Sequence, residues 1–270
     1  MLNALCIIIP VHSSNPSRYE LISFQQCFKI LGKHSIKIIA PQGLNLDKYK
    51  NVIPEFVTVF IDPKWQSSIT GYNKLKTSRF FYNLFSEYKY LLTYELDAFV
   101  FKDDLAYWCG KGYDYIGAPW FEGFDVSPEN ANLIGVGNSG FSLRKIDSVQ
   151  NVLANLFYKN PSEYNSGYLN LTKAYIKMPF RWFMNQLGEN YTVQNYYDYY
   201  EDIFFSFTTP MYFKNFKIAP KEEALKFSFE VKPERLFELN NHKLPMGCHA
   251  WWRYNLNFWR PFIEQYGYTL

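Results

Sequence analysis

Two carboxylates, Glu95 and Asp97, stand in the stretch TYELDAF (residues 93–99), which otherwise has the composition of a buried β-strand. Alternate residues of a strand share a face, so the spacing predicts that the two acids lie side by side. Unpaired buried carboxylates repel each other and lose hydration, and a divalent cation removes both costs. Carboxylate oxygens suit Mg²⁺ or Mn²⁺ alike. The structural alternative is that Glu95 pairs with a nearby lysine and Asp97 caps the next turn.

A second acidic pair, Glu201 and Asp202, precedes the aromatic run IFFSF. The helix dipole favours acids in a first helical turn, and that explanation is sufficient for one of them. In the functional alternative, Asp202 faces a cleft and takes a proton from an attacking hydroxyl. Further on, PMGCHAWW contains His249. A lone histidine is more often structural, but beside a carboxylate site its imidazole could complete a metal site or bind a phosphate.

The stretch GVGNSG (residues 135–140) matches the pattern G-x-G-x-x-G. A dinucleotide-binding fingerprint follows the first strand and opens a helix, whereas this stretch lies in mid-chain and runs into the strand-like FSLRK. We therefore exclude a dehydrogenase. The glycines permit a backbone that passes close to a ligand, with N–H groups free to contact it, and the alternative is a flexible turn.

Composition narrows the class of protein. The 270 residues are 48% hydrophobic, which is typical of a globular chain, and a net charge of +3 without a basic run argues against a nucleic-acid partner. Four scattered cysteines argue against a disulfide scaffold or zinc site and indicate a reducing, cytoplasmic setting. The N-terminal ALCIIIPV is too short to span a bilayer and lacks the charged flank of a signal peptide. The C-terminal HAWWRYNLNFWRPF suits a peripheral membrane contact, although packing on the core is the favoured alternative.

Hydrophobic patterns predict alternating strands and helices. ALCIIIPVH, SIKIIAP, FVTVFID and KYLLTYELDAFVF are strand-like, whereas residues 19–31 and SRFFYNLFSEY are helix-like. Beyond residue 102 the pattern is less regular, with a helix expected around 145–158. The fold class is therefore α/β, a single domain with a mostly parallel sheet, and its ligand site is expected at the carboxyl ends of the strands.

Five stretches in order, SEYKYLLTYELDAFVF, YDYIGAPWF, VGNSGFSLRK, EDIFFS and PMGCHAWW, span residues 86–252. Together they resemble the GT-A class of nucleotide-sugar-dependent glycosyltransferases. In particular, they resemble a bacterial family that is labelled only as a domain of unknown function. The resemblance implies one GT-A-like domain over residues 1–270, with a Rossmann-like sheet flanked by helices. Residues 1–102 would form its nucleotide-binding half and residues 103–270 its acceptor-binding half.

The resemblance also implies roles for the acidic residues. ELD stands where the class has an Asp-x-Asp metal motif, so Asp97 would bind Mn²⁺ or Mg²⁺, and Glu95 would support it or contact the ribose. The first position departs from the motif, because it is Glu in place of Asp. His249 would be the C-terminal metal or phosphate ligand. Asp202, with Glu201 beside it, would correspond to the acidic catalytic base.

Further positions follow from the same resemblance. Pro10 and Val11 would lie near the nucleotide base, and Lys74 and Arg79 near the diphosphate. The alternative for Lys74 and for Arg79 is an exposed, solvated charge without a ligand. The loop between donor and acceptor would contain the residues Gly137, Asn138 and Gly140. Stacking on sugar rings, with core packing as the alternative, is expected for Trp120, Trp251 and Trp252.

The function implied is an inverting, metal-dependent glycosyltransferase. It would move a sugar, from UDP-sugar by preference, to a hydroxyl of a glycan or lipid-linked glycan in bacterial surface-polysaccharide (O-antigen) synthesis, in the cytoplasm or at the inner membrane face. A retaining reaction would remove Asp202 from the base role. One alternative is a sugar-nucleotidylyltransferase, which needs a glycine-rich loop after the first strand, where PVHSSNPSRY has no glycine. The other is a non-catalytic carbohydrate-binding protein of the same fold.

Overall fold

A six-stranded sheet forms the centre of the molecule in the computed structural model, which describes residues 3–154, 172, 176–187 and 200–270. Its strand order is β3-β2-β1-β4-β9-β6. The first four strands along the sheet are parallel, and β9 runs antiparallel to both of its neighbours. The prediction of an α/β fold with a mostly parallel sheet is confirmed. The strands are β1 (Asn3–Pro10), β2 (Ser35–Pro41), β3 (Val57–Ile61), β4 (Tyr88–Tyr94), β6 (Tyr115–Ile116) and β9 (Phe141–Lys145).

Two smaller sheets accompany the large one. One has the order β10-β11-β5 and the other pairs β7 with β8. Their strands are β5 (Phe99–Val100), β7 (Ala118–Phe121), β8 (Leu133–Gly137), β10 (Ser228–Phe229) and β11 (Gly247–Cys248).

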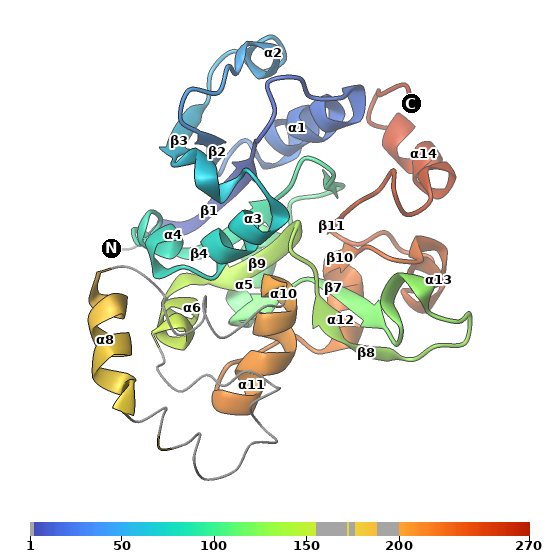
Figure 1. Cartoon of the computed structure of the whole chain (residues 1–270). Helices are drawn as coiled ribbons and strands as arrows, with labels where there is room; N and C mark the ends of the chain where they lie inside the picture. Colours follow the sequence, from blue (N-terminus) through green and yellow to red (C-terminus); the bar gives the residue numbers. More distant parts are fainter. Residues whose placement is uncertain (1–2, 155–171, 173–175, 188–199) are drawn as a thin grey trace.

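Figure 1 shows how the helices surround these sheets. Some of them begin at capping residues: Ser17 and Glu20 form a reciprocal capping box at the start of α1, and Ser68 caps α3 by accepting a hydrogen bond from the backbone N–H of Gly71. Among the described residues, the helices up to residue 203 are α1 (Arg18–Leu31), α2 (Asp47–Lys50), α3 (Ile69–Lys76), α4 (Arg79–Asn83), α5 (Leu105–Lys111), α6 (Ile146–Leu153), α8 (Met178–Gln186) and α10 (Glu201–Ile203). A π-helical stretch (Phe204–Thr208) continues α10, and it is followed by α11 (Thr209–Tyr212), α12 (Lys221–Phe227), α13 (Pro233–Leu239) and α14 (Leu256–Glu264).

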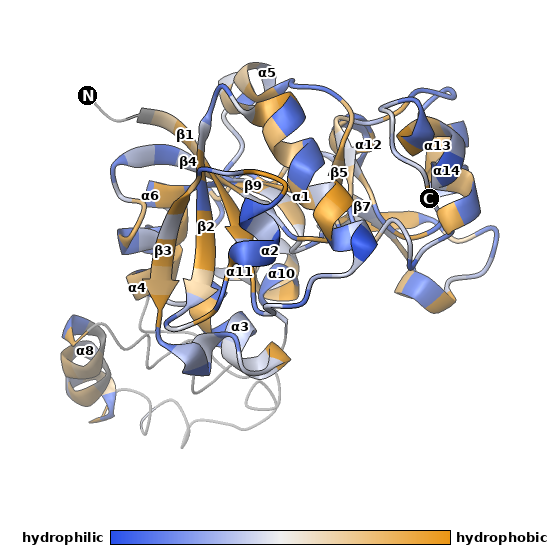
Figure 2. Ribbon diagram, turned by 90° about the horizontal axis from the view of Figure 1, so that it is seen from above, coloured by the Kyte–Doolittle hydropathy of each residue, from blue (hydrophilic) through white to orange (hydrophobic). Residues whose placement is uncertain are grey.

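Burial explains the continuous apolar runs of the central strands. Ile7, Ile8 and Ile9 on β1 are fully buried, because β1 is covered on both faces. Hydrophobic colour accordingly runs through the strands of the large sheet (Figure 2). Side chains of α1 and α6, such as Phe24 and Val149, join the same core.

The C-terminal aromatic segment packs on the protein. Trp251 and Trp259 are fully buried and belong to a second apolar cluster that includes Phe99 and Phe101. The favoured alternative for this segment is therefore confirmed, and these two tryptophans do not form a membrane-facing surface. None of the helices that the structure describes is both long and apolar enough to cross a membrane.

The predicted strand KYLLTYELDAFVF is wrong in its middle. Strand β4 ends at Tyr94, residues 95–98 form a turn, and β5 starts at Phe99. The turn is closed by the N–H of Ala98, which donates to the carbonyl of Glu95. The two acids are therefore brought together by a turn and not by strand alternation. The expected helix SRFFYNLFSEY is also shorter, because α4 ends at Asn83, and the expected 145–158 helix ends at Leu153, its last residues lying outside the described ones.

The topology gathers distant segments at one edge of the large sheet. Parallel β1 and β4 end there at Pro10 and Tyr94, and antiparallel β9 begins beside Tyr94. Strand β11 pairs with β5 and brings the next residue, His249, to the turn that follows β4. Strand β10 pairs with β11 and places Glu230 beside His249, whose N–H donates to the carbonyl of Phe229.

Candidate active site

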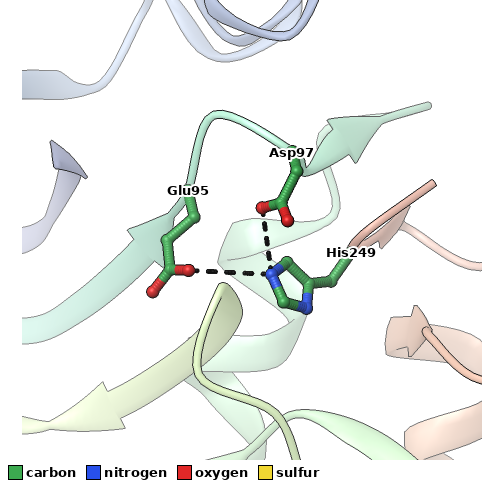
Figure 3. Close-up of side chains that lie close together, drawn as sticks. All are labelled: Glu95, Asp97 and His249. Carbon is green, nitrogen blue, oxygen red and sulfur yellow. Dashed lines mark ion pairs between the residues drawn. The ribbon is translucent and has the colours of Figure 1, made fainter. Parts of the chain in front are cut away.

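Glu95, Asp97 and His249 form a cluster at this edge (Figure 3). One ligand atom from each lies within 4.8 Å of the others. His249 Nε2 is 3.0 Å from Asp97 Oδ1 and 3.6 Å from Glu95 Oε2. One imidazole nitrogen and two carboxylate oxygens converge on a single point, as in a site for a divalent cation.

Glu230, which is not itself in the cluster, fixes the direction of the His249 ring. The Nδ1 atom of His249 lies 2.8 Å from Glu230 Oε1, and the other Glu230 oxygen accepts a hydrogen bond of 2.9 Å from Trp120 Nε1. The Nδ1–H tautomer leaves Nε2 facing the acids, as in the carboxylate–histidine pairs of metal sites. Among the described residues, the buried Nε2 atom has no hydrogen-bond partner of good geometry. The donor set therefore fits a cation ligated through this nitrogen.

Glu95 divides its two oxygens between different tasks. Oε1 accepts hydrogen bonds from Tyr72 (2.9 Å) and Ser139 (3.0 Å) and lies 3.4 Å from the ammonium of Lys76. Oε2 is left to face His249. The alternative that Glu95 pairs with a lysine is thus correct in part, but the same carboxylate also belongs to the cluster.

The charges of the cluster are coupled. Burial lowers the pKa of His249, but the carboxylates of Asp97, Glu230 and Glu95 raise it more, so that it lies well above its ordinary value. Burial raises the pKa of Glu95, and Lys76 and His249 outweigh this effect, so Glu95 stays ionised. Without a cation, a protonated His249 balances the acids. A bound cation would take over that role, because ligation requires a neutral imidazole.

Asp202 belongs to the same cleft. It lies in α10, and its Oδ1 accepts a hydrogen bond of 2.8 Å from the N–H of Ile203. Burial, followed by the charges of Glu201 and Glu230, raises its pKa from 3.8 to about 7. A carboxylate with this pKa exchanges protons near neutral pH, which suits a general base.

Its neighbour Glu201 points elsewhere. The Glu201 side chain is 1% exposed and forms ion pairs with Arg144 (2.8 Å) and Lys76 (3.0 Å), both fully buried. The functional role predicted for Glu201 is therefore not one of direct contact with a substrate in the cleft.

The cleft has a volume of about 550 Å³. Its walls contain Pro10, Asp97, Ser139, Asp202 and Trp252, so residues from several of the predicted motifs share one space. Val11 is fully buried and is not among the described lining residues.

Two of the tryptophans expected to stack on sugar rings do not line the cleft. Trp120 and Trp251 are buried, and their indole N–H groups bond Glu230 and Ser23, so only Trp252 of the three tryptophans lines the cleft. Lys74 is exposed on α3, and neither it nor Arg79 is among the described lining residues. Their proposed contact with a diphosphate stays a prediction.

The glycine stretch works differently from the expectation. The N–H groups of Gly140 and Phe141 donate to the side chain of Asn138, so they are not free for a ligand. Glycine is required because neighbours approach closely: a Cβ on Gly140 would lie 2.1 Å from His249 Nε2, and one on Gly137 would lie 2.1 Å from the Trp120 ring. The glycines therefore pack against His249 and Trp120, and Ser139 is the residue of the stretch that lines the cleft.

Two important residues, Lys76 and Glu230, are absent from the sequence prediction. Lys76 sits in LKTSRF and is expected from sequence to be solvated, as most lysines are. Glu230 ends the strand-like FSFE, and an acid directly after an apolar strand is the same signal that singled out Glu95. That signal was available for Glu230.

Together, the fold and the site define an α/β protein with a carboxylate–histidine cluster in a cleft at the sheet edge. The chain belongs to the family described as protein of unknown function (DUF5672), whose sequence model matches residues 55–249. A comparison with curated proteins gave no match.

Solved structures with a similar fold include several sugar transferases. Mouse xyloside xylosyltransferase 1 has 10% sequence identity and a TM-score of 0.49, over 94% of this chain and 99% of that one. The galactosyltransferase LgtC, in complex with donor and acceptor sugar analogues, has 11% identity and a TM-score of 0.46, over 90% and 86%. A glycosyltransferase involved in the glycosylation of the major capsid of PBCV-1 has 10% identity and a TM-score of 0.41, over 91% and 92%.

Proposed function

We propose that this protein is a metal-dependent glycosyltransferase that moves a sugar from a nucleotide-sugar donor to a hydroxyl of a glycan acceptor. One observation carries the proposal: Glu95, Asp97 and His249 converge beside a cleft whose walls also contain Asp202. The ordered resemblance of residues 86–252 to the GT-A class supports the same reaction.

The metal would be held by Asp97, Glu95 and His249. When bound, Mn²⁺ or Mg²⁺ supplies Lewis-acid stabilisation of the departing nucleoside diphosphate. Tyr72 and Ser139 donate hydrogen bonds to Oε1 of Glu95, and Glu230 fixes the His249 ring, so the ligands are pre-oriented.

The negative charge of the cleft opposes the binding of an anionic donor. The described lining residues include four acids, Glu20, Glu95, Asp97 and Asp202, and neither lysine nor arginine. A nucleoside diphosphate brought against these acids would be repelled. We therefore expect binding of the nucleotide to depend almost entirely on the cation.

Asp202 is proposed as the general base. In its ionised form it accepts the proton of the acceptor hydroxyl, which then attacks the anomeric carbon from the face opposite the leaving group. The cleft holds donor and acceptor together and so lowers the entropic barrier. The reaction proposed is accordingly a displacement with inversion. Trp252, at the same cleft, would stack on a sugar ring.

The finer assignments rest on the class resemblance. They are a UDP-sugar donor, a glycan or lipid-linked glycan acceptor, and a role in bacterial surface-polysaccharide synthesis in the cytoplasm or at the inner face of the membrane. Pro10 at the cleft wall would lie near the nucleotide base.

Calorimetric titration with UDP, GDP and CMP, each with and without Mn²⁺, tests the proposal on the wild type, Asp97→Ala and Asp147→Ala. Asp147 is an exposed acid on α6 and serves as the matched control. We expect one nucleotide to bind only with Mn²⁺, and binding to disappear in Asp97→Ala but not in Asp147→Ala. Absence of binding by every nucleotide, or equal binding without metal, would refute the proposed function.

A further inference from the structure

We propose that Lys76 is a positioning residue that ties the metal-binding turn to the helix bearing Asp202. The inference rests on the proposed function for the roles of the two sites it joins. The tie itself is a property of the metal-free protein, so it is tested separately below.

Lys76 is completely buried at the end of α3 and has polar partners on two sides. Its ammonium lies 2.5 Å from Ser139 Oγ and 3.1 Å from the Ser139 carbonyl. It also lies 3.4 Å from Glu95 Oε1 and 3.0 Å from Glu201 Oε1. One cation therefore touches both the cluster carboxylate and the residue directly before Asp202.

These contacts extend into a chain of alternating charge. Arg144 pairs with Glu201, Glu201 with Lys76, and Lys76 with Glu95. Two cations and two anions balance each other, which is the condition under which buried charges are tolerated. The chain runs from β9 through α10 and α3 to the turn after β4.

Helix α3 holds the start of α10 at a second point. The side-chain oxygen of Asn73 accepts a hydrogen bond of 2.8 Å from the N–H of Glu201. Asn73 and Lys76 are about one helical turn apart, and both contact Glu201: Asn73 binds its backbone N–H, and Lys76 pairs with its carboxylate. Because Asp202 follows at once, its place relative to the cluster is set through Glu201.

The geometry explains why Lys76 is needed in addition to Asn73. α10 is the first turn of a helical run that continues to Tyr212, and the N–H groups of a first turn have no partners within their own helix, so this end needs partners from elsewhere. Without the ammonium, Glu95 and Glu201 would face each other as like charges with no cation between them. We expect α10 to move, whereas Glu95 keeps Tyr72 and Ser139, and Asp97 and His249 keep their places.

Hydrogen exchange of residues 201–208 provides the test, on metal-free wild type, Lys76→Met and Lys48→Met. Lys48 is exposed on α2 and is the matched control. We expect exchange in this segment to accelerate about tenfold or more in Lys76→Met, with the rest of the core and the control unchanged. With a donor in hand, kcat should fall by about 10²-fold, as for a displacement of about 1 Å, with KM little changed.

The double variant Lys76→Met/Glu201→Gln separates positioning from charge balance, since it removes one cation and one anion together and leaves the net charge of the buried group unchanged. Exchange and kcat should remain impaired in it. Wild-type exchange and kcat in this double variant, or unchanged exchange in the folded single variant, would overturn the positioning role. Failure of the wild type to bind Mn²⁺ or any nucleotide would instead refute the proposed function. The exchange result would still decide whether Lys76 holds α10 in place.

Discussion

The carboxylate of Glu230 lies 2.8 Å from Nδ1 of His249 and bridges this ring to the indole of Trp120. One acid therefore accepts two N–H donors, and the imidazole can turn only its Nε2 atom toward Glu95 and Asp97. The direction of His249 is determined by a residue that is not itself in the cluster.

Replacing Glu230 by glutamine should weaken metal binding although the change is nearly isosteric. A glutamine amide has one acceptor oxygen, so it cannot satisfy both the His249 and the Trp120 donors. Loss of such an outer carboxylate costs about 10- to 100-fold in metal affinity. Titration of free Mn²⁺ by electron paramagnetic resonance measures the change.

Glu222→Gln is the matched control for this variant, because Glu222 is exposed on α12. It should bind Mn²⁺ as the wild type does. Equal Mn²⁺ affinity of Glu230→Gln and Glu222→Gln would show that Glu230 does not orient a metal ligand.

Gly140→Ala should disturb the cluster with little effect on the rest of the protein. The added methyl group would stand 2.1 Å from His249 Nε2, and the ring cannot swing away without breaking its bond to Glu230. We expect Mn²⁺ affinity to fall by about tenfold or more, the size of other orientation effects on metal ligands. Gly110→Ala is the control, because a Cβ there meets nothing within 4 Å. Its free energy of unfolding should rise by about 0.5–1 kcal/mol, because Gly110 lies inside α5 and alanine is favoured over glycine in a helix. A normal Mn²⁺ affinity in Gly140→Ala would place the metal elsewhere.

Local sequence patterns predicted the strands and the acids at their ends. The isoleucine run of β1 and the carboxylates after β4 are visible because apolar continuity and buried charge are one-dimensional signals. The turn at residues 95–98 was missed because the apolar residues around the acids continue the strand-like pattern, and no glycine, proline or asparagine marks the turn.

Partner choice is what the sequence could not supply. Nothing local distinguishes Lys76, which is buried against two acids, from Lys74, which is exposed two residues earlier. Glu201 and Asp202 are adjacent and chemically alike, yet Arg144 on β9 takes one of them into a buried ion pair, whereas the other lies at the cleft. These distinctions arise from the packing of α3, α10 and β9.

Asp202→Asn should reveal the raised pKa of this group through stability. Because the folded-state pKa is about 7 and the ordinary value is 3.8, the folded protein retains a proton that the unfolded chain releases between these pH values. Stability of the wild type therefore falls as pH rises through this window, and the asparagine variant escapes the loss. Denaturant titration of metal-free protein should show the variant gaining stability above pH 7, by at most about 4 kcal/mol at 1.36 kcal/mol per pKa unit, and gaining little at pH 4. The same variant should abolish transfer, whereas wild-type kcat/KM should rise with pH toward a plateau above about 7. A stability difference that is independent of pH would show that Asp202 titrates normally and would remove it from the role of a base tuned to neutral pH.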